Sequence, residues 1–132
     1  MTDDGMTVRR EVLGDEHVDR AAATASAFSA PWQDYVTANA WGAVWTRPGL
    51  DRRTRSMLTV ALLTALGHHH ELAMHVRAAI SNGVTATELC EVLMHTAVYA
   101  GVPAANSAFG VAQQVLADLG VPEAVSPPSG SA

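Results

Sequence analysis

Residues 51–67 read DRRTRSMLTVALLTALG, and this stretch decides the fold class. Asp51 is a favourable helix N-cap, and Gly67 is a favourable C-terminal stop. From Met57 to Leu66 the side chains are apolar almost all the way round, which predicts a helix buried on most of its sides. A chain this small has few other elements to cover such a helix, so the pattern also predicts a homo-oligomer.

Helix signals recur along the rest of the chain, and the sequence shows no alternating strand pattern bounded by hairpin turns. It therefore predicts an all-α fold, a compact bundle of five to six helices. Each helix is expected between a capping or proline start signal and a glycine or proline stop signal. The expected spans are 15–24, 29–47, 51–67, 69–81, 85–101 and 103–120.

One helical domain is expected over residues 8–120, because no linker-like composition interrupts that span. Residues 1–7 are expected to be a flexible N-terminus, and VRREVLG at 8–14 to be extended. Residues 121–132 are expected to be a disordered tail, because Pro, Ser and Gly dominate them. In the helix at 29–47 the side chains expected to point inward are Tyr35, Val36, Trp41, Val44 and Trp45.

The composition of the 132 residues excludes several classes of function. All eight basic side chains are arginine, so lysine Schiff bases, lysine-bound pyridoxal phosphate and a Walker lysine are excluded. A net charge of −5 argues against a nucleic-acid partner, and the longest apolar stretch is too short to span a membrane. Cys90 is the single cysteine and the N-terminus lacks a signal-peptide pattern, so we expect a cytoplasmic protein without an internal disulfide.

Histidines concentrate at the start of the helix expected at 69–81, where the chain reads HHHELAMH from His68 to His75. A zinc-protease motif needs two histidines four residues apart, with a glutamate directly after the first. His70-Glu71 is followed by His75 one position too late, so that motif is absent. A looser trio of His68, Glu71 and His75 shares a helix face and is an alternative site for a divalent cation.

The same helix carries an apolar stripe formed by Leu72, Val76, Ala79 and Ile80. Glu71 and His75 are expected side by side at the edge of this stripe, one helical turn apart. There Glu71 can accept a hydrogen bond from the imidazole, which would raise its pKa and keep it a proton donor near neutral pH. The alternative is an ordinary ion pair on the helix surface, which contributes little to stability.

Half of the basic side chains fall within nine residues, as Arg47, Arg52, Arg53 and Arg55. Guanidinium groups beside a helix N-terminus favour carboxylates, so this arginine cluster predicts an anionic small-molecule ligand. Arg55 aligns with Leu58 and Leu62 on the apolar helix, where its charge needs a ligand or an ion-pair partner such as Asp51 or Glu71. Trp45 borders the cluster and can wall a pocket there, or belong to the core with Trp41.

Four further polar side chains give weaker signals. His95 and Tyr99, four residues apart, are interpreted as a solvated or interfacial face, and Cys90 as a small hydrophobic side chain. Asn106 is either a local cap or a ligand contact.

Three segments together resemble the carboxymuconolactone decarboxylase family: WTRPGLDRRTRS at 45–56, ELAMHVRAA at 71–79 and TAVYAGVPAANSAF at 96–109. The stretch VRREVLGDEHVDRA near the start adds to the resemblance, which covers about residues 8–119. It implies the all-helical alkylhydroperoxidase-like fold and a cytoplasmic homo-oligomer, either a hexamer built as a trimer of dimers or a trimer. It also implies cofactor-independent and metal-free decarboxylation of 4-carboxymuconolactone to the β-ketoadipate enol-lactone, in protocatechuate breakdown.

The peroxidase branch of the same superfamily carries a Cys-x-x-Cys pair before a helical histidine. The corresponding positions here are His68 and Glu71, so the resemblance disfavours a peroxidase. If the chain is a decarboxylase, His75 is the expected general acid, and Glu71 is expected to orient its imidazole. Arg55, Arg52 and Arg47, walled by Trp45, are expected to hold the substrate's carboxylate or the developing oxyanion. Two alternatives remain, namely a divergent member that acts on another unsaturated lactone or keto acid, and a non-catalytic oligomeric binder.

Overall fold

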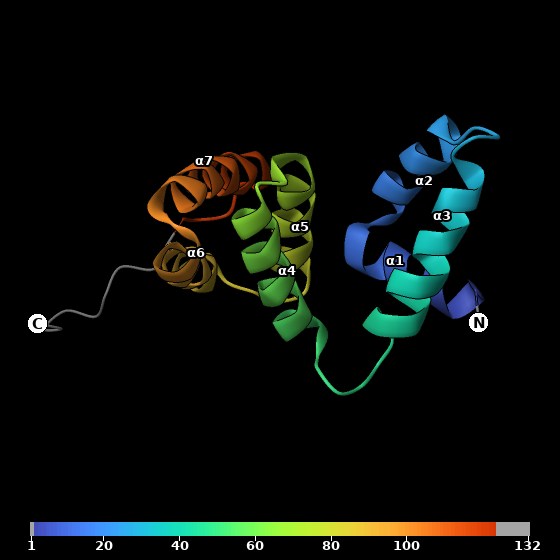
Figure 1. Ribbon diagram of the computed structural model, residues 1–132, viewed down its shortest axis with the longest axis horizontal. Coiled ribbons are helices and arrows are strands. Elements are labelled where there is room, and N and C mark those ends of the chain that lie inside the picture. Colours follow the sequence, from blue (N-terminus) through green and yellow to red (C-terminus); the bar gives the residue numbers. More distant parts are fainter. Residues whose placement is uncertain (1, 124–132) are drawn as a thin grey trace, which may run out of the picture. The chain divides into compact units, whose positions relative to one another are not determined.

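The computed structural model describes residues 2–123, and within that span it contains helices and no strand, as the sequence predicts (Figure 1). Helices α3 and η1 follow each other without a break and count as one helix, so the described span contains seven helices. Their bounds are α1 (Thr2–Leu13), α2 (Asp15–Thr24), α3 (Ala30–Val36), η1 (Thr37–Trp45), α4 (Arg52–Leu66), α5 (His69–Ser81), α6 (Ala86–Ala100) and α7 (Val102–Leu119).

The chain separates into two compact units, residues 1–55 and 56–132, where the sequence predicts one domain over 8–120. The first unit holds α1, α2, α3, η1 and the first turn of α4. The second unit holds the remainder of α4 and helices α5, α6 and α7. Most of the tail expected at 121–132 lies outside the described residues.

Helix α1 occupies the stretch that was expected to be loose at 1–7 and extended at 8–14, so those two expectations are wrong from Thr2 onward. It packs against η1 and α2, and its buried face carries Val8, Arg9 and Val12. Gly5 lies on this face too, one turn before Arg9. A glycine and an arginine interrupt the apolar pattern of this face, so the spacing of apolar residues does not predict the helix.

The helix expected at 29–47 changes its register part of the way along. It begins as α3 and continues as the π-helix η1, in which the main chain makes wider turns than in an α-helix. The wider turns alter which side chains of η1 share a face, whereas Tyr35 lies before them, on an exposed side of α3. The inward set therefore differs from the expected one. Trp41 is buried and Trp45 half-buried, but Tyr35 and Val44 are exposed.

Helix α4 begins as predicted, because the Asp51 carboxylate accepts a hydrogen bond from the Thr54 main-chain N–H at 2.7 Å. Its buried side is narrower than expected. The inward face has one residue per turn and consists of Ser56, Val60 and Thr64. The opposite face carries leucines that are 48%, 61% and 67% exposed, at Leu58, Leu62 and Leu66 respectively. One chain therefore covers α4 on one side only, and the burial expected on most of its sides stays a prediction about an assembly of chains.

The core of the second unit is aliphatic, and α7 packs against both α5 and α6. Alanines on the inward face of α7 (Ala108 and Ala112) leave room for Leu72 of α5 and for Leu89 and Leu93 of α6. The start of α6 is the predicted capping box: the Thr85 hydroxyl accepts from the Glu88 N–H at 3.1 Å, and the Glu88 carboxylate accepts from the Thr85 N–H at 2.9 Å. The predicted helix at 69–81 is confirmed as α5.

The close approach of α1 to η1 can be tested at Gly5. A Cβ atom at this position would lie 2.5 Å from the Thr37 carbonyl oxygen and 2.9 Å from the Gly42 nitrogen, so the main chains would have to separate. We expect Gly5→Ala to lower the free energy of unfolding by about 1–3 kcal/mol, measured from urea denaturation. Gly110→Ala is the control, because a Cβ there meets no atom within 4 Å. That change is expected to stabilise α7 by roughly 0.5–1 kcal/mol. A Gly5→Ala protein as stable as the wild type would contradict the close packing.

Candidate functional site

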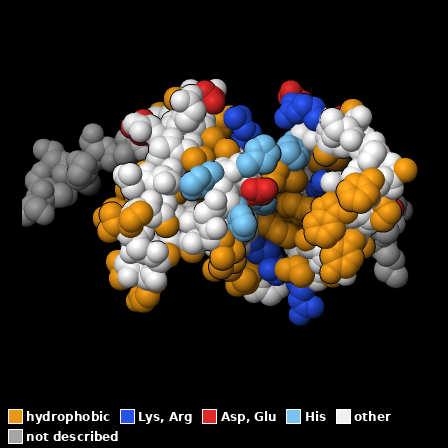
Figure 2. Space-filling view, turned by 45° about the horizontal axis from the view of Figure 1, so that its top comes forward, with side chains coloured by type: hydrophobic (Ala, Val, Ile, Leu, Met, Phe, Trp, Pro, Cys, Tyr) orange, Lys and Arg blue, Asp and Glu red, His pale blue; other side chains and the backbone are white. Residues whose placement is uncertain are grey.

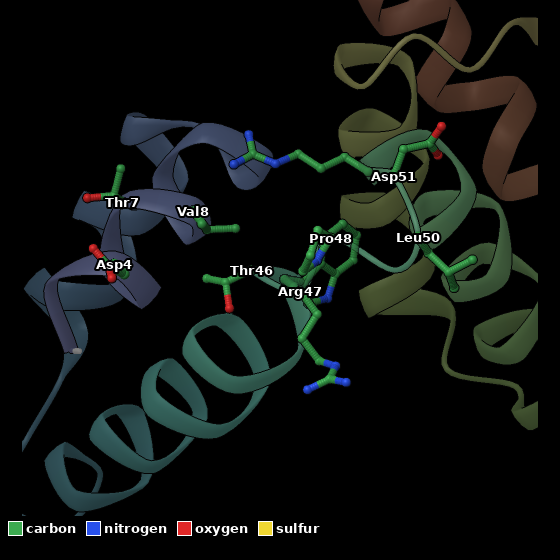
Figure 3. A pocket seen from close by; sticks show the side chains of 10 residues that line it. Asp4, Thr7, Val8, Thr46, Arg47, Pro48, Leu50 and Asp51 are labelled. Atoms are coloured by element: carbon green, nitrogen blue, oxygen red, sulfur yellow. The ribbon is translucent and has the colours of Figure 1, made fainter.

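A pocket of about 410 Å³ lies in the first unit, between α1 and the segment that follows η1. Figure 3 shows Asp4, Thr7 and Val8 of α1 on one side, and the labelled residues from Thr46 to Asp51 on the other. Three of the predicted ligand-binding residues line this pocket, namely Trp45, Arg47 and Arg52. The structure therefore brings together most of the site that the arginine cluster predicts.

The fourth predicted residue, Arg55, braces the segment rather than lining the pocket. Its Nη2 donates a hydrogen bond to the main-chain carbonyl oxygen of Arg47 at 3.1 Å. This bond ties the first turn of α4 back to the end of η1. Within a single chain Leu58 and Leu62 are exposed and Arg55 is half-buried, so this chain alone does not bury the face that the three were expected to share.

Positive charge is available inside the pocket. Arg52 is paired with Glu11 at 3.1 Å, but both side chains are substantially exposed, and such surface pairs are weak. Among the side chains of residues 4–123, no acidic group pairs with the exposed guanidinium of Arg47. A carboxylate ligand can therefore reach Arg47 directly, and can compete with Glu11 for Arg52.

The Asp51 carboxylate lines the same pocket, but it is engaged by the main chain. The hydrogen bonds from Thr54, helped by the nearby charge of Arg53, hold the pKa of Asp51 below its ordinary value. Asp51 is the N-cap of α4, and its negative charge faces the positive end of the helix dipole. The acid therefore fixes the position of the helix that carries Arg52.

On α5, His75 is buried, with 9% of its surface exposed, and it lies among Leu72, Val76 and Ala79. The expectation that it lies at the edge of the apolar stripe is wrong, because positions 72, 75, 76 and 79 all share one face of the helix. Glu71 is exposed, and among the described side chains no hydrogen bond joins it to His75. The expected Glu71–His75 pair therefore stays a prediction.

Histidine side chains gather on the surface around an acidic side chain, as Figure 2 shows. At the start of α5 the exposed residues of this kind are the N-cap His68 and, within the helix, His69, His70 and Glu71. Within residues 2–123, no group of three or more His, Cys, Asp or Glu side chains has an arrangement that could hold a metal ion. The trio of His68, Glu71 and His75 is therefore not assembled.

The weaker candidates lie on α6 and α7. The His95 and Tyr99 rings are 5.2 Å apart, and both side chains are exposed, in agreement with a surface face. Cys90 is half-buried and lines an apolar pocket of about 270 Å³, as a small hydrophobic side chain would. Asn106 is exposed and borders a separate shallow pocket with Phe109. None of the helices in the described span is long and apolar enough to cross a membrane.

Sequence reasoning missed the contribution of α1 to the pocket. Asp4, Thr7 and Val8 were assigned to loose or extended chain, but they form one wall. It also missed Arg9, which is buried and donates hydrogen bonds to Thr37 and Gln33. The helical spacing of Gly5, Arg9 and Val12 is the sequence feature that could have predicted α1, because this helix has no continuous apolar stripe.

The fold and the pocket define a small all-α protein with two arginines in an open pocket and a buried histidine on a neighbouring stretch of sequence. Residues 30–114 match the model of the carboxymuconolactone decarboxylase family, and the chain belongs to this family, whose fold is alkylhydroperoxidase-like. The resemblance drawn from the three sequence segments is thereby confirmed.

Two curated relatives are similar over most of their length. The chain is 49% identical to 4-carboxymuconolactone decarboxylase of Acinetobacter baylyi over 123 residues, which are 92% of each chain. It is 45% identical over 117 residues to nitrosuccinic acid decarboxylase npaB of Metarhizium robertsii, covering 89% of this chain and 82% of that one. An uncharacterised 15.0 kDa protein of Paracoccus denitrificans is 36% identical over 80 residues, which are 59% of this chain and 60% of that one.

The Asp51 cap predicts a pH dependence of stability. Because folding lowers the pKa of Asp51, its ionised form stabilises the folded state above the ordinary carboxyl pKa of about 4. That contribution is lost as the pH falls through the lowered pKa. Asp51→Asn keeps a capping side chain but has no charge to lose. We expect the variant to be less stable than the wild type at neutral pH, and the difference in urea midpoint to shrink toward zero as the solution is acidified. A difference that stays constant with pH would contradict this assignment.

Proposed function

We propose that this chain is a carboxy-lyase that converts 4-carboxymuconolactone to the β-ketoadipate enol-lactone in protocatechuate breakdown. The observation that carries the proposal is the 49% identity, over 92% of both chains, to a relative named for this activity. The pocket supports it, since Arg47 and Arg52 suit a substrate with more than one carboxylate. The cytoplasmic location expected from the single cysteine stays a prediction.

The substrate supplies the electron sink for the reaction. The departing carboxylate is attached to a ring carbon next to a double bond that is conjugated with the lactone carbonyl. When the carbon–carbon bond to CO2 breaks, its electron pair moves through that double bond to the carbonyl oxygen and gives an aromatic oxyfuran anion. A proton added to ring carbon then yields the enol-lactone. The protein must hold the substrate, stabilise the oxyanion and deliver a proton, so we propose that no cofactor is needed.

The arginines of the first unit are proposed to bind the substrate's negative charge. Arg47 and Arg52 line the pocket with Trp45 as an apolar wall, and each guanidinium can hold a carboxylate in a bidentate manner. Arg55 contributes by holding the Arg47 carbonyl, which fixes the segment that presents Arg47. Removal of charge at Arg47 or Arg52 then weakens substrate binding.

His75 is proposed as the general acid that protonates the ring carbon. It is the buried histidine of the family-matched segment, and the side chains packed around a buried imidazole hold it in a defined position. Glu71 is proposed to orient it, since residues four apart on a helix are neighbours. Catalytic hydrogen bonds are often absent or long in a free enzyme and shorten when substrate binds, so the pair can form during turnover.

Substitutions on α5 and α6 test the proposed function. His75→Ala and Glu71→Gln are each expected to lower kcat at least about a hundredfold, because proton transfer to carbon loses its donor or the donor loses its orientation. The assay is the loss of 4-carboxymuconolactone, followed spectrophotometrically with chelator-treated protein. His95→Ala is the matched control, an exposed histidine on α6 that is expected to leave kcat unchanged. Wild-type kcat in His75→Ala would overturn the general-acid role, and no turnover by the wild type would overturn the proposed substrate.

A second candidate substrate is nitrosuccinic acid, because a relative named for its decarboxylation is 45% identical over 89% of this chain. In this acid the carbon that loses CO2 carries a nitro group, which accepts the electron pair as a nitronate. The chemistry is therefore the same in outline, with a dicarboxylate held by arginines and a proton returned to carbon. Comparison of kcat/KM for the two acids decides between them.

We infer that the protein works as a homo-oligomer, a hexamer built as a trimer of dimers or a trimer. The support is a row of exposed leucines along α4 at Leu58, Leu62 and Leu66, whose contiguous apolar surface is costly to leave in water. On α6 and α7 further apolar side chains are more than 70% exposed, at Val98, Tyr99 and Val102. Such faces are typical of obligate interfaces.

Leu62→Glu tests the α4 face. A carboxylate at the centre of the leucine row would be buried without a partner in the assembly, so we expect a smaller species by sedimentation velocity at micromolar concentration. Ala117→Glu adds the same charge at an exposed position of α7 and is expected to leave the mass unchanged. A monomeric wild-type protein would contradict the inference.

A further inference from the structure

Arg9 is a buried cation that is bonded to neutral groups. Only 8% of its surface is exposed, and its Nη1 donates to the Thr37 Oγ1 at 3.0 Å while its Nη2 donates to the Gln33 Oε1 at 2.9 Å. Among the side chains of residues 4–123 no carboxylate pairs with it, and burial lowers its pKa. Burial of a charge without a countercharge is costly, so the arrangement must have a structural or functional reason.

The two acceptors lie on either side of the change from α-helix to π-helix. Gln33 belongs to α3, and Thr37 is the first residue of η1. One turn earlier on α1, Gly5 approaches the carbonyl of the same Thr37 and the main chain of Gly42. Helix α1 therefore makes two contacts at the point where the α-helix becomes a π-helix. One is the close packing of Gly5 against the main chain of η1, and the other is the pair of hydrogen bonds from Arg9.

The register of η1 determines where its C-terminal end lies. Each residue of a π-helix advances by a different rotation from that of an α-helix, so a shift at Thr37 would rotate Trp45 and the Arg47 that follows. These two residues belong to one wall of the pocket, and the α1 residues Asp4, Thr7 and Val8 form the other. Arg9 does not line the pocket itself. It acts on the pocket through the helix that carries Trp45 and Arg47.

We propose that Arg9 is a positioning residue for substrate binding: by holding Gln33 and Thr37 it fixes the π-helical register that places Trp45 and Arg47 opposite α1. The proposal rests on the proposed function for its kinetic consequence. Its structural consequence, the arrangement of the η1 side chains, does not depend on any substrate.

Arg9→Gln and Arg10→Gln form a matched pair of variants. Arg10 is the next residue on the same helix, and its guanidinium pairs with Asp15 and Asp19 at 3.0 Å each, on the surface. Both variants lose one positive charge from α1. We expect Arg9→Gln to raise KM for 4-carboxymuconolactone about tenfold with kcat within about twofold, and Arg10→Gln to change neither. Thr37→Val removes one acceptor of Arg9 with little change in shape, and it is also expected to raise KM. This variant provides the test if Arg9→Gln does not fold.

A second readout needs no substrate. The Trp41 and Trp45 rings lie 5.1 Å apart with their planes at 32°, so the near-ultraviolet circular dichroism of the indoles reports the register of η1. We expect Arg9→Gln and Thr37→Val to alter this signal and Arg10→Gln to preserve it. Unaltered indole signals in folded Arg9→Gln and Thr37→Val proteins would overturn the proposal, as would an unchanged KM. If the wild type lacks turnover, the proposed function fails, and the indole signal alone decides the role of Arg9.

Discussion

The contact between α1 and η1 is the constraint on which the arginine pocket depends. Gly5 allows the two main chains to approach so closely that a Cβ atom has no room, and Arg9 adds hydrogen bonds one turn further along. Both contacts meet at Thr37, where the helix changes register. The pocket opens at the far end of η1, so its shape follows from this contact. Burial of the Arg9 guanidinium is costly, and on the proposal above it fixes the position of the residues proposed to bind the ligand.

The proposed chemistry asks little of the protein beyond charge and a proton. A substrate that accepts its own electron pair needs neither a lysine nor a redox-active cysteine pair, and the sequence contains neither. Arginine is suited to the remaining task, because its fork of donors recognises carboxylates and stays charged at any physiological pH. The same requirements apply to both acids named by the curated relatives, which explains how one small helical fold can serve either substrate.

Much of the fold could be predicted from the sequence, because caps and stop signals are local. The capping box at Thr85 and the Asp51 cap formed as expected. The predictions failed where packing between helices decides the outcome. Helix α1 has no apolar stripe, the π register of η1 depends on α1, and His75 lies within the buried face of α5 rather than at its edge. Of the predicted pocket, Trp45, Arg47 and Arg52 could be found because they are close in sequence, whereas the α1 wall comes from a distant segment.

In the proposed reaction the protein removes CO2 from its substrate and itself returns the proton to carbon. Turnover of 4-carboxymuconolactone in D2O, with analysis of the product by NMR, separates this reaction from loss of CO2 followed by protonation from bulk water. We expect release of CO2 and an enol-lactone that carries one deuterium on a single face of the protonated carbon, because a positioned acid delivers it. Absence of turnover, or deuterium divided equally between the two faces, would contradict it.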